Sequence, residues 1–244
     1  MFFSSTVRIR KEIYLSDIIK WTNENSGFLT LLLFLVTLFF GWISGIFKHL
    51  RHRPNFIFNL IPGPTFCCTF ITGRKYESYD TKRTAIVIYL TIKNIGSASS
   101  QIEKIQVGYH NHTFKYSFLW FWLNTTISLK DFGHTVGDNL RHYPFLIQKN
   151  ILLPQNNITY LKNGQSASGI VYFEQSESYG GFVPKVKNGK VKINVKVYDI
   201  YNKSYTKTFW IPIVDLDYAK KFNEEFGQSL EKIEQGEIEE WKVF

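Results

Sequence analysis

Residues 27–47 (GFLTLLLFLVTLFFGWISGIF) form a run of twenty-one amino acids without one ionisable side chain. As a helix rising about 1.5 Å per residue, this run is long enough to cross the hydrocarbon core of a bilayer, which is about 30 Å thick. A helix also satisfies its own backbone hydrogen bonds, which lipid cannot do. We therefore predict a transmembrane helix at 27–47. The alternative is a core helix of a soluble domain, but such helices are usually shorter and carry a polar stripe.

The flanks of this run predict a retained single-pass anchor. Twenty-six residues precede it and a basic collar follows at 48–54, whereas a cleaved signal peptide has a short basic start and a shorter apolar region. The collar contains Lys48, Arg51 and Arg53, while the nearest residues on the other side offer only Lys20. Because basic flanks stay on the cytoplasmic side, we expect the C-terminal domain to be cytoplasmic.

Several residues near the run are expected to contact membrane or another helix. Residues 1–26 are either a tail or an amphipathic helix in the membrane interface, with Trp21 at headgroup depth. Trp42 is a second predicted interface contact, and the basic collar is a third. Gly41 and Gly45 have the GxxxG spacing that allows two membrane helices to approach closely.

The net charge of +9 is unevenly distributed along the chain. Residues 215–244 hold nine acidic residues and four lysines, a net charge of −5, so the preceding residues carry +14. A basic body favours anionic partners such as lipid headgroups or nucleic acid. Because the anchor already brings the chain to a membrane, we expect the lipid bilayer as a partner. Anionic headgroups and a protein partner remain open, and no specific nucleic-acid binding is expected.

Residues 55–213 have the pattern of a β-rich domain. Apolar side chains at 191, 193, 195 and 197 alternate with Lys192, Asn194 and Lys196, as in a strand with one face buried and one in water. Several other short runs rich in branched and aromatic residues are separated by turn signals, and no βαβ rhythm occurs. We predict an antiparallel β-sandwich over 55–213.

Three segments resemble immunoglobulin-like or fibronectin-III-like modules of bacterial surface and membrane proteins. They are residues 87–107, with an Asn-x-Gly turn between two strands, residues 161–173, and the closing hairpin 190–213. The resemblance implies a mainly β architecture and brings no function with it. The Cys…Trp…Cys core of antibody domains is absent, and the adjacent Cys67 and Cys68 are expected to stay reduced.

Two segments depart from the strand pattern. Residues 116–123 (YSFLWFWL) predict either a strand buried on both faces or an aromatic loop that contacts membrane through Trp120 and Trp122. We favour the buried strand, because cores are commoner than membrane-contacting loops. Residues 130–150 are predicted to form a long loop.

The acidic C-terminal residues 214–244 are predicted to form one amphipathic helix that packs on its own domain. Its apolar stripe recurs at intervals of three and four residues: Tyr218, Phe222, Phe226, Leu230 and Ile233.

The candidate ligand-binding residues lie in the predicted long loop: His134, Asp138, Arg141 and His142. They form a cluster of titratable groups without a positioned nucleophile, and the chain has no hydrolase, metalloprotease, phosphate-loop or dinucleotide fingerprint. His110 and His112 would share one face of a strand, but a metal site usually needs a third ligand. We therefore expect no enzymatic activity, no metal and no cofactor.

A basic set with nearby tyrosines, which includes Lys192 and Lys196, could also serve nucleic acid, although alternating lysines are the usual solvent face of a strand. The expected function is a membrane-anchored, non-catalytic β-sandwich that binds or senses a ligand. One alternative is a membrane-acting effector of a bacterial defence system, with an anchor that oligomerises. The other is a surface module that binds glycan or protein.

The basic residues that flank the predicted transmembrane helix give a first testable prediction, about membrane topology. A reporter active only in the cytoplasm, fused after Phe244, is expected to be active, because the basic collar holds that side of the helix in the cytoplasm. Activity of a periplasm-only reporter at the same position would place the domain outside and favour the surface module.

Overall fold

The computed structural model describes residues 20–46, 52–111, 119–147, 159–180 and 182–237. The chain divides into two compact units, Met1–His52 and Arg53–Phe244, each of which is described by itself. The expected interfacial helix falls almost wholly outside the described residues, as do Lys48, Arg51 and His112.

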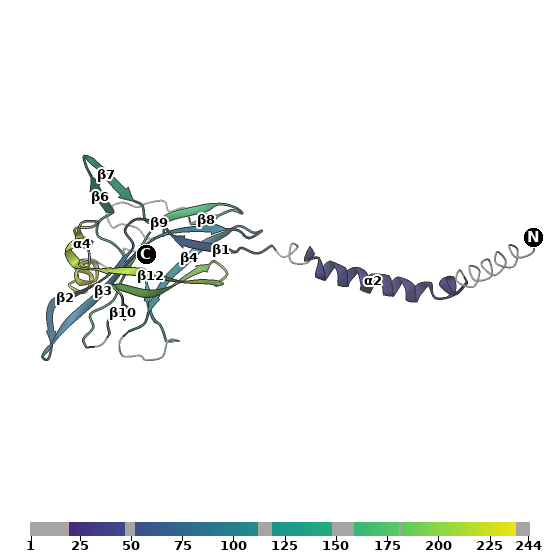
Figure 1. The fold of residues 1–244 in the computed structure, drawn as a ribbon, viewed down its shortest axis with the longest axis horizontal. Coiled ribbons are helices and arrows are strands. Elements are labelled where there is room, and N and C mark those ends of the chain that lie inside the picture. The colour runs from purple at the N-terminus through teal and green to yellow at the C-terminus, as the bar shows by residue number, and fades with distance from the viewer. Residues whose placement is uncertain (1–19, 47–51, 112–118, 148–158, 181, 238–244) are drawn as a thin grey trace, which may run out of the picture. The chain divides into compact units, whose positions relative to one another are not determined.

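The first unit contains helix α2, Ser26–Ile43 (Figure 1). Its 18 residues correspond to about 27 Å at about 1.5 Å each, and the helix is apolar enough to cross a membrane. None of its residues is buried. Trp21 and Trp42 are also exposed, at 53% and 75%. Gly45 lies beyond the end of α2 with a φ of 75°, so it does not continue the helix face of Gly41, and packing of the two glycines against another helix stays a prediction.

The second unit is mainly β, and its strands fall into two groups. The first group contains β1 (Phe56–Leu60), β2 (Phe66–Tyr76), β3 (Tyr79–Asn94) and β9 (Ser166–Glu174). The second contains β4 (Ser100–Tyr109), β5 (Phe121–Asn124), β11 (Lys190–Asp199) and β12 (Ser204–Val214). The short strands β8 (Tyr160–Leu161) and β10 (Val186–Lys187) extend the second group along β4 and β11.

The pairing of these strands makes one mixed sheet. In the first group, β3 pairs with β1 and β2 along one edge and with β9 along the other. In the second group the order is β12, β11, β4, β5. The two groups join where the end of β12 runs parallel to β2, with Ile213 opposite Cys67 and Val214 opposite Cys68. The other strand pairs among the described residues are antiparallel.

Both groups of strands contribute to one hydrophobic cluster. Alternate residues of β11, from Val191 to Val197, enter this cluster as the sequence pattern predicted. They pack with side chains of the first group such as Ile86, Ile88 and Phe173. The alternation therefore leaves the other face of β11 for polar side chains, including Lys192 and Lys196.

A second cluster covers the opposite face of β2, β3 and β9. Phe66, Val87 and Tyr172 contribute from the strands, and Phe226 contributes from the C-terminal segment. As a result β3 is covered on both sides, and its residues 85–88 are fully buried. This explains why residues 85–92 read as a continuous apolar run.

The C-terminal segment is two short helices and differs from the single helix expected. Helix α4 covers Leu216–Lys220 and α5 covers Ser229–Glu234. Between them Gly227 adopts a φ of 78°, in the left-handed region that ends a helix and that glycine occupies at low cost. The stripe residues Phe222 and Phe226 still pack on the sheet, so the predicted docking is correct although the helix is broken.

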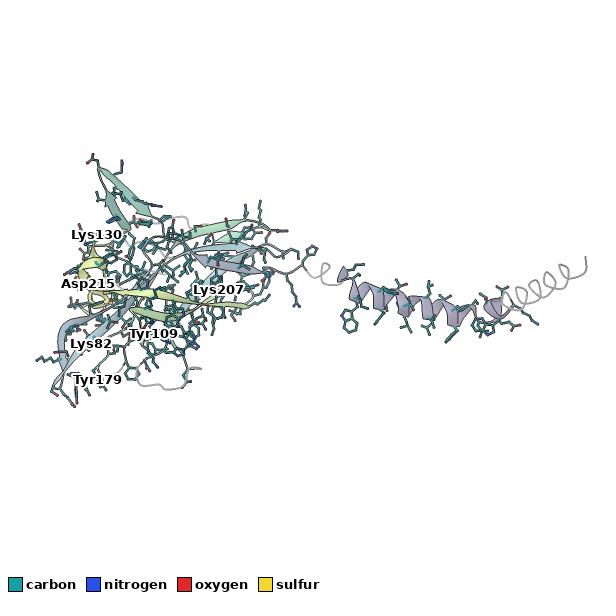
Figure 2. The ribbon with its side chains drawn as sticks, viewed as in Figure 1. Lys82, Tyr109, Lys130, Tyr179, Lys207 and Asp215 are labelled. Carbon is teal, nitrogen blue, oxygen red and sulfur yellow. The ribbon has the colours of Figure 1, made fainter. Side chains whose placement is uncertain are left out.

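The expected long loop at 130–150 contains a hairpin, β6 (Phe132–Val136) and β7 (Asn139–Tyr143), which projects from the other strands (Figure 1). Gly137, with a φ of 62°, makes the turn. At its base Phe132 and Tyr143 enter the second cluster. Lys130, labelled in Figure 2, forms a 2.9 Å salt bridge with Glu224 and ties the hairpin to the C-terminal segment.

The point where the chain enters the second unit is held by a buried asparagine. Asn94 Oδ1 accepts hydrogen bonds from the backbone N–H of Asn55 (3.2 Å) and of Gly96 (3.0 Å). Asn94 Nδ2 donates to the carbonyls of Ala98 (2.7 Å) and Leu161 (3.0 Å). A Cβ atom at Gly96 would lie 2.3 Å from Asn55 N, which explains the glycine of the Asn-x-Gly turn.

These bonds predict a large effect on stability. Asn94→Ala is expected to lower the free energy of unfolding by about 2–4 kcal/mol, because it leaves four backbone groups without this partner, two of them buried. Urea unfolding of the detergent-solubilised chain, followed by far-UV circular dichroism, measures the change. The matched control is Asn163→Ala at an exposed turn position, for which the change should stay within about 0.5 kcal/mol. Equal effects of the two substitutions would show that the hydrogen bonds of the Asn94 side chain do not have this stabilising role.

Candidate functional site

The four residues predicted as a ligand cluster lie on the β6–β7 hairpin without converging. His134 is directly opposite Arg141, and His142 is directly opposite Gly133. Because successive residues of a strand alternate in direction, His142 lies on the other face from His134 and Arg141. Asp138 lies in the turn. His134 instead packs on the ring of Phe222, at 5.1 Å between ring centroids.

The other groups considered for chemistry are also explained by packing. Cys67 and Cys68 are free and buried, and burial raises the pKa of the Cys68 thiol to about 12, so neither offers a thiolate at neutral pH. His110 Nδ1 donates to the carbonyl of Leu119 at 2.6 Å. Within the described ranges, no three His, Cys, Asp or Glu side chains come together as metal ligands.

A buried ionic network joins the strands to α5. The guanidinium of Arg83, itself 1% exposed, lies 3.4 Å from Glu174 Oε1 and 2.8 Å from Glu234 Oε2. The hydroxyl of Tyr172 donates to Glu174 Oε2 at 2.8 Å and accepts from the backbone N–H of Gly227 at 3.2 Å. Burial raises the pKa of Glu174, although the bonds from Tyr172 and Arg83 act in the opposite direction. The network joins α5 to β3 and β9 through Arg83, Glu174 and Glu234.

The aromatic segment is an edge strand with two different faces. Residues 116–118 lie outside the described part, and the rest leads into β5, which pairs with β4. Leu123 enters the first cluster and Phe121 packs against it, whereas Trp120 and Trp122 are half-buried on the other face. The expected strand buried on both faces is therefore wrong for the described residues.

Trp122 lies over the strand next to it. It is directly opposite Gly108 of β4, and a Cβ atom at Gly108 would sit 3.0 Å from the indole ring. The ammonium of Lys196 lies 4.1 Å from the centroid of the same ring. Glycine at 108 thus allows the indole to lie against the backbone, within cation–π distance of a lysine on the strand beyond.

Trp120 forms a similar arrangement one step along the sheet. Its ring packs on that of His110 at 3.9 Å between centroids, with the two planes tilted by 32°, and the ammonium of Lys192 lies 5.8 Å from its centroid. Lys192 is in turn directly opposite Trp210 of β12, whose side chain is 49% exposed. The indoles at β5 and β12 therefore lie on either side of the lysines of β11, with Gly108 and His110 of β4 between them.

We call this outer surface the Trp–Lys face. Its cross-strand neighbours follow from the register of β5, β4, β11 and β12, and its residues are Trp120, Trp122, Asn124, Gln106, Gly108, His110, Lys192, Asn194, Lys196, Thr206, Thr208 and Trp210. None of these twelve residues is acidic. The face thus concentrates positive charge and aromatic area without a neutralising carboxylate of its own.

Two polar atoms of the Trp–Lys face are buried without a hydrogen-bond partner among the described residues. They are His110 Nε2 and Asn194 Oδ1. By contrast, Gln106 Nε2 donates to Asn124 Oδ1 at 2.8 Å. A buried polar atom without a partner costs about 1–3 kcal/mol, so these two atoms mark positions where a bound water or ligand group adds stability.

An open groove of about 1250 Å³ borders the Trp–Lys face at Trp122, Gln106 and Asn124. Leu230 and Ile233 of the C-terminal segment line its other side. The groove also contains acidic side chains, Glu103, Glu174 and Glu177 among them. The groove therefore carries acidic side chains, whereas the Trp–Lys face carries none.

Sequence reasoning identified part of this surface. It placed Lys192, Asn194 and Lys196 in water and singled out Trp120 and Trp122. It missed Gly108 and Trp210, because only the pairing of strands brings them to the same surface. Comparison with protein-family models and with curated proteins found no match to this chain.

The network around Glu174 predicts a pH dependence. A glutamate with a raised pKa binds its proton more tightly in the folded chain, so its contribution to stability is present at low pH and is lost as pH rises through the folded-state pKa. Glu174→Gln removes this loss. Above the ordinary glutamate pKa of 4.5, wild type should therefore lose stability relative to Glu174→Gln as pH rises.

Urea unfolding of both proteins at a series of pH values measures this difference. Glu237→Gln, at an exposed position outside the network, is the control that removes the same kind of side chain. The contrary outcomes are a difference in free energy of unfolding between wild type and Glu174→Gln that stays constant with pH or that changes in the opposite direction. Either result would show that the buried carboxyl is not the titrating group.

Proposed function

We propose that this chain is a single-pass, membrane-anchored and non-catalytic binding or sensing module. In this proposal α2 crosses the membrane, with the second unit on the cytoplasmic side. The second unit is an immunoglobulin-like or fibronectin-III-like β-sandwich, and its Trp–Lys face binds an anionic ligand. The observation that carries the proposal is the acid-free pairing of indoles with Lys192 and Lys196 on one face.

The anchor is supported by burial as well as composition. An apolar helix of a soluble protein hides its side chains in a core. The side chains of Leu33 and Phe40 are exposed in this structure, and the helix has no buried residue. A bilayer is the environment that gives such a helix an apolar surrounding on all sides.

The Trp–Lys face is supported by its departure from an ordinary solvent face. Solvent faces of strands mix charges of both signs, whereas this face presents Lys192 and Lys196 without an acid. Each lysine is held near an indole, which fixes its ammonium more firmly than a free side chain would be. Fixed cations with neighbouring amides and hydroxyls are suited to an anion that carries hydrogen-bonding groups.

A binding role is favoured over catalysis by the positions of the reactive groups. The hairpin histidines point to opposite faces, and both thiols are buried. Glu174 is occupied by Arg83 and Tyr172. The Trp–Lys face itself offers cations, amides, hydroxyls and indoles, with one imidazole, His110, packed on Trp120. Such groups recognise a ligand without supplying a general base beside a nucleophile.

Polyanion binding tests the proposal. The detergent-solubilised full chain is titrated into fluorescein-labelled dextran sulfate, with neutral dextran as a parallel probe, and fluorescence anisotropy reports binding. Lys192→Gln with Lys196→Gln is expected to weaken binding to dextran sulfate by about 10- to 30-fold at low salt, because each lysine contributes about 1 kcal/mol near an anionic surface.

The matched control is Lys93→Gln with Lys162→Gln, which removes the same charge at exposed positions outside the face. This variant should bind nearly as wild type does. Equal weakening by both variants would show that net charge, and not the Trp–Lys face, determines binding, and the proposal would fail.

A further inference from the structure

The ligand class of the Trp–Lys face follows from its chemistry together with the anchor. Resting on the proposed function, we propose that this face docks on the anionic lipid headgroups of the same bilayer that holds α2. The occupant is thus a lipid surface that offers phosphates and hydroxyl groups, and the docking uses the indoles and lysines together.

The charges of the face complement such a surface. Lys192 and Lys196 lie on one strand and point to the same side, and no carboxylate of the face competes for them. Their ammonium groups lie 5.8 Å and 4.1 Å from the indoles of Trp120 and Trp122. An ammonium placed over an indole keeps hydrogens free for a phosphate oxygen on its outer side.

The indoles suit the depth at which lipid headgroups lie. Tryptophan has an apolar body and one N–H donor, and it concentrates at membrane interfaces for that reason. Trp210 is 49% exposed, and Trp120 and Trp122 are half-buried on the same outer face. Because β5 and β12 are separated by two strands at about 4.8 Å spacing, the indoles are spread over about 14 Å, which favours an extended surface over one small ligand.

The covalent connection makes weak docking effective. Twelve residues lie between Ile43, where α2 ends, and Phe56, where β1 begins, and a chain of that length reaches at most about 40 Å. A short tether holds a binding surface at an effective concentration of about millimolar, so a few weak contacts suffice. A soluble anion has no such advantage.

The two unpartnered atoms fit the same occupant. Asn194 Oδ1 is buried, so it can accept from a headgroup hydroxyl only through a bridging water. His110 Nε2 is the ring nitrogen left over once Nδ1 donates to Leu119. Single-stranded nucleic acid also combines stacking with positive charge, but it needs open ring faces, and here Lys196 lies over Trp122.

The test uses the full chain in lipid nanodiscs, so that the helix is embedded in every sample. One set contains phosphatidylcholine alone and the other a mixture of phosphatidylcholine and phosphatidylglycerol. The rate at which an amine-reactive ester acylates each lysine is measured by mass spectrometry. In anionic nanodiscs, Lys192 and Lys196 are expected to react about fivefold more slowly than in neutral ones, while Lys93 and Lys162 should not change. The protection should disappear at high salt.

Substitution of an exposed indole separates docking from folding. Trp210→Ala removes a half-exposed side chain and should reduce the protection of Lys192 in anionic nanodiscs. Tyr160→Ala, which removes an aromatic ring with 51% exposure elsewhere on the unit, is the control and should leave the protection intact. Equal loss of protection in both variants would contradict a role for the indole.

A parallel sample in neutral nanodiscs receives single-stranded oligothymidylate or dextran sulfate as a soluble polyanion. If anionic lipid gives no protection but a soluble polyanion protects Lys192 and Lys196, the lipid occupant is wrong and the proposed anion-binding function stands. If neither protects these lysines, both the lipid occupant and the anion-binding face are wrong. Protection by anionic lipid together with the loss in Trp210→Ala establishes the docking.

Discussion

Burial of strand β3 on both faces is the constraint on which the second unit depends. One face of β3 packs with β4 and β11, and the other packs beneath the C-terminal segment and the base of the β6–β7 hairpin. Because residues 85–88 of β3 are covered on both faces, the described part of the C-terminal segment packs on the sheet through Phe222 and Phe226. Arg83, buried on this strand, meets both Glu174 and the α5 residue Glu234, so the ionic network and the apolar contacts act on the same element.

This arrangement leaves the second group of strands with one covered face and one open face. The alternation of β11 directs valines and an isoleucine into the core and lysines outward, and β5 does the same with Leu123 and Trp122. Tight packing on the inner side fixes the strand register, and the register then determines which outward side chains become neighbours. The Trp–Lys face is thus a consequence of core packing on the opposite side of the same strands.

Much of the fold was predictable wherever the signal is local. The period-two pattern of 191–198 and the apolar run at 85–92 both mark strands, because alternation and burial are properties of a few consecutive residues. The hairpin at 132–143 was missed because its strands are short and mostly exposed, so their side chains carry little pattern. The apolar stripe at the C-terminus correctly predicted packing on the sheet and wrongly predicted one continuous helix. Gly227 bends the chain without interrupting the spacing of Phe222 and Phe226.

The sequence by itself determined an apolar helix long enough to cross a bilayer, a β-rich body and a basic excess, because length, composition and alternation are local quantities. Only the tertiary structure decided that Trp122 lies over Gly108 and beside Lys196, and that His134 and His142 point apart. These relations depend on which strands pair and in what register, and pairing is set by contacts between residues far apart in the chain.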